Sequence, residues 1–161
     1  MNWARVKIAV LAIIVLLILI QIFQPRRTNP PTAASRTIEA HVQIPEDVRG
    51  PLRRACGDCH SNQTVWPWYS QIAPISWVVI DDVNQGRRHM NFDDWEALKG
   101  PTLATTRLTD ICKEIQENGM PPFSYRIAHP KSLLKAKEIA AVCSWSNSFA
   151  ASPQNGPGTP P

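Results

Sequence analysis

Residues 55–69 (ACGDCHSNQTVWPWY) place two cysteines, a histidine and three aromatic side chains in one short stretch. Cys56 and Cys59 are three positions apart, and His60 follows directly. A pair of cysteines with this spacing could form a redox dithiol, provide half of a zinc site or, because a histidine comes next, attach a haem. The rest of the sequence has to distinguish these three kinds of site.

Two of the three kinds find little support elsewhere in the chain. A thioredoxin-type dithiol follows a buried β-strand, whereas the residues before Cys56 (EDVRGPLRRA) are charged and helical in pattern. A structural zinc site needs four ligands and normally has a second close pair. The other cysteines, Cys112 and Cys143, stand singly within helical patterns, and no second Cys-x-x-Cys or His-x-x-x-His occurs. The sequence therefore favours covalent attachment of one c-type haem.

Helical geometry gives each residue of this motif a role. Positions i and i+3 of a helix project toward the same side, so Cys56 and Cys59 could bond the two vinyl groups of the haem. His60 would then lie under the iron as its proximal ligand.

A distal iron ligand would come from a later loop, and residues 117–123 (ENGMPPF) have the composition of one. Gly119 stands where a helix needs a left-handed C-terminal residue, and the two prolines after Met120 keep the backbone extended. We expect Met120 to bind the iron. The alternative is that Met120 fills a gap in the core, and Met90, His89 and His129 are weaker candidates.

The elements that must position these residues are helical, because strand-like alternation is essentially absent and apolar residues recur with a helical period. The first helix could begin at Gly50, since Pro51 is tolerated only in a first turn. Ser132 is a suitable N-cap for the last one. The expected helices cover 45–60, 73–89, 92–100, a stretch through Ala104, Leu108, Ile111 and Ile115, and 132–149. These helices predict an all-α domain.

A chain of 161 residues has room for one ordinary domain plus appendages. Residues 1–23 contain a nearly continuous apolar run behind a short positive front, which predicts a signal anchor with one transmembrane helix. Residues 24–44 are rich in Pro, Thr, Ser and Ala and predict an extended linker. Residues 45–149 form the expected haem domain, and residues 150–161 have the composition of a disordered tail.

The formal charge of +4 does not indicate nucleic-acid binding, because the basic residues are concentrated before the domain. Residues 1–36 hold five of the 17 Lys and Arg residues and no acidic residue, which leaves 12 basic against 13 acidic residues in the rest. No basic stripe remains on the expected domain, so nucleic acid is not an expected partner.

Residues 56–95 (CGDCHSNQTVWPWYSQIAPISWVVIDDVNQGRRHMNFDDW) and the later Met-Pro-Pro closely resemble the haem-binding domain family of small bacterial cytochrome c-like proteins. The resemblance covers roughly residues 40–149. It implies a periplasmic, membrane-tethered haem protein in which Cys56 and Cys59 are the thioether anchors, His60 is the proximal ligand and Met120 the distal one. Cys112 and Cys143 do not belong to the family pattern.

Two further expectations concern residues around the motif. Trp66 and Tyr69 follow it closely, and their N–H and O–H groups could meet a haem propionate, although ordinary core packing is the alternative. Haem attachment uses two of the four cysteines, and Cys112 and Cys143 lie on the inward sides of expected helices. In an oxidising compartment we expect these two to form a disulfide; the alternative is a pair of buried free thiols.

The function expected from these features is one-electron transfer by a cytochrome c-like helical domain, not an enzymatic reaction, and no catalytic residue is assigned. Thioethers form outside the bacterial cytoplasmic membrane, so the domain should face the periplasm from a single-pass anchor in the inner membrane. Its partners would be redox proteins at the membrane or in the periplasm. The alternative is a haem enzyme or a gas or redox sensor with an open distal iron position, if Met120 does not bind.

Overall fold

The computed structural model describes residues 2–150, and within them the secondary structure is helical without any strand. The all-α prediction is therefore confirmed. The first helix, α1 (Trp3–Leu19), is continued by a 3₁₀ turn at Ile20–Ile22. The domain contains α2 (Ile38–His41), α3 (Glu46–His60), α4 (Ile75–His89), α5 (Pro101–Gln116), α6 (Phe123–Ala128) and α7 (Ala136–Ser148). Short 3₁₀ turns cover Ala34–Arg36, Trp68–Gln71 (η3), Trp95–Ala97 and Pro130–Ser132.

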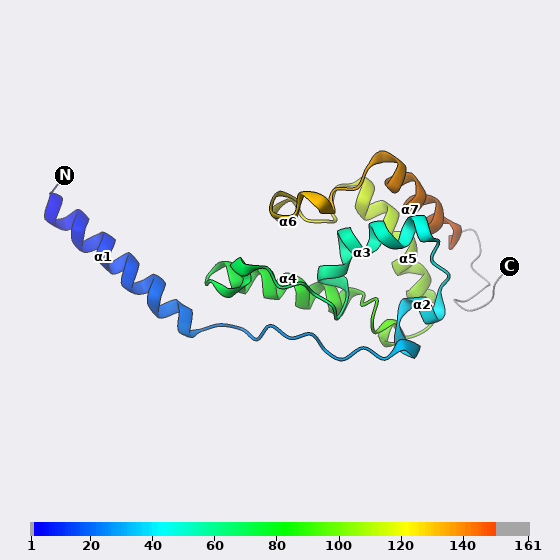
Figure 1. The fold of residues 1–161 in the computed structure, drawn as a ribbon, viewed down its shortest axis with the longest axis horizontal. Helices are drawn as coiled ribbons and strands as arrows, with labels where there is room; N and C mark the ends of the chain where they lie inside the picture. Colours follow the sequence, from blue (N-terminus) through cyan, green and yellow to red (C-terminus); the bar gives the residue numbers. More distant parts are fainter. Residues whose placement is uncertain (1, 151–161) are drawn as a thin grey trace.

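The core of the domain lies where α3, α5 and α7 pack together (Figure 1). Each helix contributes an apolar stripe at helical spacing, as expected for one buried face. The buried members are Val48 and Leu52 of α3, Ala104, Leu108 and Ile111 of α5, and Val142 and Trp145 of α7. α4 crosses α3 and extends from this group toward the side of α1 (Figure 1).

The disulfide expected between the two remaining cysteines is confirmed, and it joins α5 to α7 through Cys112 and Cys143. A buried serine strengthens the same junction. The hydroxyl of Ser146 donates to the carbonyl of Leu108 at 2.6 Å and accepts from the backbone N–H of Cys112 at 3.2 Å. The two helices are therefore held by a covalent bond, two polar contacts and the apolar core.

α3 begins at Glu46, so the expectation that it could start at Gly50 is wrong. Pro51 lies inside the helix, where it removes one backbone donor. Gly50 before it has no Cβ to collide with the proline ring, which reduces the usual clash at this position. Glu46 and Asp47 also place negative charge at the N-terminus of the helix, which favours an early start.

The expected helix over 92–100 is also wrong, because only Trp95–Ala97 form a 3₁₀ turn. Contacts with the end of α3 fix the preceding residues in another conformation. The N–H of Phe92 donates to the carbonyl of His60 at 2.7 Å, and the carboxylate of Asp93 accepts from the N–H of Asn62 at 2.9 Å. These tertiary hydrogen bonds replace the ones a helix would make.

Two helix ends also differ from the expectation. α7 has Lys135 as its N-cap residue, with the Lys135 N–H donating to the carboxylate of Glu138, whereas Ser132 is buried in the preceding 3₁₀ turn. Beyond α5, the residue with positive φ is Asn118 at 58°, not Gly119. Asn tolerates the left-handed region better than most residues because its short side chain can bond locally.

The extended linker expected to reach residue 44 ends earlier, which corrects the boundary. Residues 38–41 form α2, and Ile38, Val42 and Ile44 belong to the core. The N–H of Ile38 also donates to the carbonyl of Phe92 at 2.7 Å. The segment has too few apolar side chains to show a helical period, and for this reason the sequence did not indicate that they are buried. The predicted tail falls at residues 151–161, outside the described residues.

Residues Trp3–Ile22 form one helix of 20 residues that is long and apolar enough to cross a membrane, and none of it is buried against the domain. Near the N-terminus, such a helix could be a membrane span or a signal sequence. In Figure 1, α1 stands apart from the domain, and the chain after it runs beside α4 toward α2.

Candidate haem site

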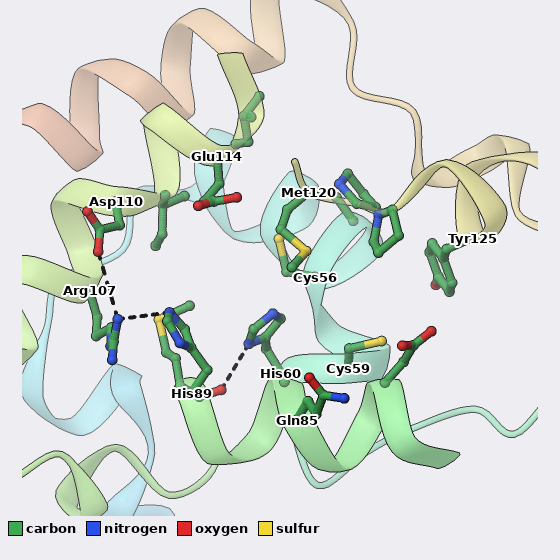
Figure 2. A pocket seen from close by; sticks show the side chains of 18 of the residues that line it. Cys56, Cys59, His60, Gln85, His89, Arg107, Asp110, Glu114, Met120 and Tyr125 are labelled. Atoms are coloured by element: carbon green, nitrogen blue, oxygen red, sulfur yellow. Dashed lines mark hydrogen bonds and ion pairs between the residues drawn. The ribbon is translucent and has the colours of Figure 1, made fainter. Parts of the chain in front are cut away.

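A cavity of about 580 Å³ lies between α3, α4, α5 and the segment that leads into α6. Its lining includes Cys56, Cys59, His60 and Met120 (Figure 2). The first three belong to the last turns of α3, and Met120 comes from a loop some 60 positions later in the chain. The structure therefore brings together the four principal residues that the sequence singled out.

His60 is held with one ring nitrogen fixed. Its side chain is buried, and Nδ1 lies 3.0 Å from the carbonyl oxygen of Met90. A carbonyl can only accept, so Nδ1 carries the proton and Nε2 keeps a free lone pair. Burial lowers the pKa of His60, which favours the neutral ring. This is the state in which a histidine binds a metal, with the second nitrogen oriented by a backbone acceptor.

Close packing of α4 against α3 sets the position of the motif. Gly86 lies so near that a Cβ added to it would be 2.5 Å from the carbonyl oxygen of Cys59. Any larger residue would push α4 away from the turn that carries the motif. The absence of a side chain at Gly86 is therefore a requirement of the site.

The thiols of Cys56 and Cys59 are free, whereas the other two cysteines form the disulfide. Burial, followed by nearby negative charge, raises the pKa of Cys56 to about 12 and that of Cys59 to about 11. A reactive dithiol needs a lowered pKa, so these thiols do not have the electrostatics of a thioredoxin-type site. Within residues 2–150, no group of three or more His, Cys, Asp or Glu is placed to hold a metal ion.

The residues present do fit a haem. Two thiols lie three positions apart on one helix, a neutral imidazole follows them, and a thioether lines the same cavity. The volume falls within the range of roughly 300–1,000 Å³ that is common for pockets holding small organic ligands. Apolar side chains complete much of the wall, among them Ala55, Ile111, Ile115, Pro121 and Pro122.

Neither Trp66 nor Tyr69 lines this cavity, and their expected contact with the haem stays a prediction. The indole N–H of Trp66 donates to the side-chain oxygen of Asn29 at 3.1 Å, and the hydroxyl of Tyr69 is 2.6 Å from Nε2 of His129. Tyr69 still lies close to the cavity wall, because the ring of His129 stacks on that of Tyr125 with their centroids 4.3 Å apart. The aromatic residue that lines the cavity is Tyr125, whose hydroxyl donates to the carboxylate of Asp58 at 2.7 Å.

The sequence reasoning missed the polar wall of the cavity, although a periodic signal was present. α4 contributes Asp82, Gln85 and His89, and α5 contributes Arg107, Asp110 and Glu114, in each case at positions i, i+3 and i+7. This spacing places three side chains on one helix face. Arg107 connects the two helices, because its guanidinium lies 2.9 Å from Nε2 of His89 and 3.9 Å from the Asp110 carboxylate (Figure 2).

Other residues of the recognised motif hold the chain behind His60 and do not line the cavity. Asn91 donates to the side-chain oxygen of Asn62 at 2.9 Å, and Gln63 donates to the Asp93 carboxylate at 3.1 Å. Arg87 donates to the carbonyl of Ser61 at 2.8 Å. These contacts satisfy the polar groups left by the end of α3, and the network fixes where that helix stops.

Comparison with known proteins agrees with this site. The model of a haem-binding domain family matches residues 15–148, which is most of the chain and includes all four principal residues. Searches of curated proteins and of solved structures find no match. The resemblance found in the sequence is thus confirmed, and the chain belongs to the haem-binding domain family.

Proposed function

We propose that this haem protein is a c-type cytochrome that carries single electrons at a membrane. The observation that supports the proposal most strongly is the cavity that joins Cys56, Cys59, His60 and Met120. Thioether bonds from the two cysteines would hold the haem covalently, and the neutral thiols lie on the helix turn that the Cys-x-x-Cys-His order requires. A bound haem supplies an iron that alternates between the ferric and ferrous states.

The protein's own residues would set how that iron behaves. His60 offers Nε2 while Met90 holds the other nitrogen, and the sulfur of Met120 offers a soft second ligand. A His and Met pair favours ferrous iron, raises the reduction potential and leaves no open position for a substrate. This ligand pair suits electron transfer better than catalysis.

The location we propose is the bacterial inner membrane, with α1 as a single-pass anchor and the domain in the periplasm. Two features support it. α1 has the length and composition of a membrane span, and the disulfide between Cys112 and Cys143 is of a kind that persists in oxidising compartments. Redox proteins in the periplasm or in the same membrane would then be the partners.

The experiment that tests this function is optical spectroscopy of the purified protein. If Met120 binds, the ferric protein shows the weak near-infrared band of sulfur-to-iron charge transfer, and the ferrous protein resists CO. Met120→Ala should remove the band, admit CO and lower the reduction potential, because the soft ligand is lost. Met90→Leu is the matched control, since it keeps the backbone carbonyl that orients His60.

A wild-type protein that lacks the band and binds CO readily would contradict the electron carrier. It would instead support the alternative function, a haem enzyme or sensor with an open iron position.

A further inference from the structure

An apolar surface remains exposed on the part of the domain formed by η3 and the first turn of α4. We call this surface the tip. Its residues and their exposed fractions are Trp68 at 73%, Ile72 at 44%, Ile75 at 51%, Trp77 at 37% and Val78 at 60%. Contiguous apolar patches are uncommon on monomeric soluble proteins and usually mark a surface that binds something.

The residues of the tip carry no charge of their own. Residues 61–80 (SNQTVWPWYSQIAPISWVVI) contain no Asp, Glu, Lys or Arg. Two exposed tryptophans among uncharged residues are the composition of protein segments at the level of lipid headgroups.

Hydrogen bonds tie the tip directly to the end of α1. The side chain of Gln21 donates to the carbonyl of Ala73 at 3.0 Å and accepts from the N–H of Ala73 at 2.9 Å. The indole N–H of Trp77 donates to the carbonyl of Phe23 at 2.6 Å, and Arg27 donates to the carbonyl of Ser70 at 2.9 Å. Figure 1 shows the same arrangement, since the start of α4 points toward the side on which α1 ends.

These bonds fix the depth of the tip once α1 is in a membrane. The 20 residues of Trp3–Ile22 span about 30 Å, which is the thickness of the hydrocarbon core. Gln21 and Phe23 therefore lie at the boundary between hydrocarbon and headgroups, and so do the residues bonded to them. We propose that the tip is inserted into the interfacial layer of the bilayer that α1 spans. This inference rests on the membrane anchoring proposed above.

Insertion of the tip has a consequence for the haem site. The tip includes the first turn of α4, and the cavity residues Asp82, Gln85 and His89 follow on the same helix. A lipid-bound tip thus holds the cavity at a set distance and orientation relative to the membrane. The domain does not swing on a flexible tether, and its haem is presented to partners in one orientation.

The first test measures access of water to the tip in the full chain, reconstituted with one chain per lipid nanodisc. Trp68→Cys and Val78→Cys are labelled with a charged, membrane-impermeant maleimide, and Leu133→Cys is the matched control. Leu133 is 53% exposed, less than Trp68 or Val78, and lies outside the tip. We expect positions 68 and 78 to react about tenfold more slowly than position 133, because lipid covers them. Peptide mass spectrometry separates these sites from the native cysteines.

The second test detects lipid contact in the wild-type chain. Nanodiscs that contain a phospholipid with a photoactivatable diazirine group are irradiated, and the cross-linked peptides are identified. The peptide with residues 68–78 should carry lipid, and that with Leu133 should not. One chain per disc excludes a second copy of the protein as the occupant.

Carbonate extraction of cell membranes distinguishes a failure of the proposed membrane anchor from a failure of the proposed tip insertion. Release of the intact chain by carbonate would overturn the anchor and the inference with it. A chain that stays in the membrane, but shows equal labelling at 68, 78 and 133 and no lipid cross-link at the tip, would overturn the inference alone.

Discussion

At the residue scale, the proposed covalent attachment of haem depends on Cys56 and Cys59 of α3. We expect Cys56→Ala with Cys59→Ala to abolish haem that survives acid-acetone extraction from protein matured in the periplasm. The reason is that each proposed thioether needs one of these sulfurs, while the disulfide between Cys112 and Cys143 leaves no other thiol among the described residues. The matched control replaces the disulfide cysteines by alanine and should retain extraction-resistant haem. Covalent haem in the first double variant would contradict the assignment.

Gly86 provides a second prediction at the residue scale. Gly86→Ala places a Cβ 2.5 Å from the backbone oxygen of Cys59, so α4 must move away from α3. We expect the free energy of unfolding to fall by about 1–3 kcal/mol, the usual cost of overpacking, and haem incorporation to fall with it. Urea unfolding of the full chain in detergent, followed by circular dichroism, measures the change.

Gly57→Ala is the control for Gly86→Ala. A Cβ at Gly57 would contact only the Arg53 side chain at an ordinary 3.6 Å, and the residue lies within the same helix as the motif. Alanine is the better helix former, so the free energy of unfolding should rise by about 0.5–1 kcal/mol. Equal destabilisation by both variants would show that the close approach at Gly86 is not the cause.

At the scale of elements, the junction of α5 and α7 determines how firmly one wall of the haem cavity is held. α5 carries the polar wall, and the bond from Cys112 to Cys143 attaches it to α7. The two cysteines are 31 positions apart. In the chain-entropy model, a bridge of this span lowers the entropy of the unfolded chain and raises the free energy of unfolding by about 3–4 kcal/mol. Replacing both with alanine should lower the free energy of unfolding by about this amount.

Two measurements check this bridge. Thiol titration of the denatured, unreduced protein should find no free thiol from Cys112 and Cys143. Reduction should lower the stability of the wild-type protein but leave that of the double alanine variant unchanged. Two titratable thiols in the first measurement would exclude the bridge.

At the scale of the whole molecule, the segment between α1 and α2 is a strap bound to the domain. Arg87 makes the largest contribution, because its guanidinium donates to Thr28 and Asn29 on the strap and to Ser61 and Thr64 on the domain, at 2.7–3.0 Å. Hydrogen bonds that involve a charged group contribute about 1.5–3 kcal/mol each. The strap therefore links the end of α1 to the residues that follow the haem motif.

We expect Arg87→Ala to release the strap and to accelerate trypsin cleavage after Arg27 about tenfold or more, since cleavage follows local opening. Arg88→Ala removes the neighbouring charge, but Arg88 lines the cavity and makes no hydrogen bond to the strap, so cleavage should keep its wild-type rate. Limited proteolysis with mass spectrometry gives both rates. Rapid cleavage of the wild-type chain after Arg27 would show instead that the strap is free.

The sequence by itself determined the helical class, the apolar N-terminal helix and the kind of cofactor. These features are local: Cys56, Cys59 and His60 lie within five positions, and the stripes of α5 and α7 repeat along each helix. The disulfide was also predictable, because two cysteines remained on inward helix faces. Local spacing and periodicity do not depend on how distant segments pack, so the sequence alone is enough to recognise them.

The tertiary structure alone decided which residues surround the cavity and where the domain begins. Ile38 is in the core because it meets Phe92, and Tyr125 lines the cavity because α6 folds back to Asp58. Other long-range contacts replace the helix expected over 92–100 and bind the strap to the domain. Such contacts join residues 31 to 67 positions apart, and their geometry depends on helix crossings that no local pattern specifies.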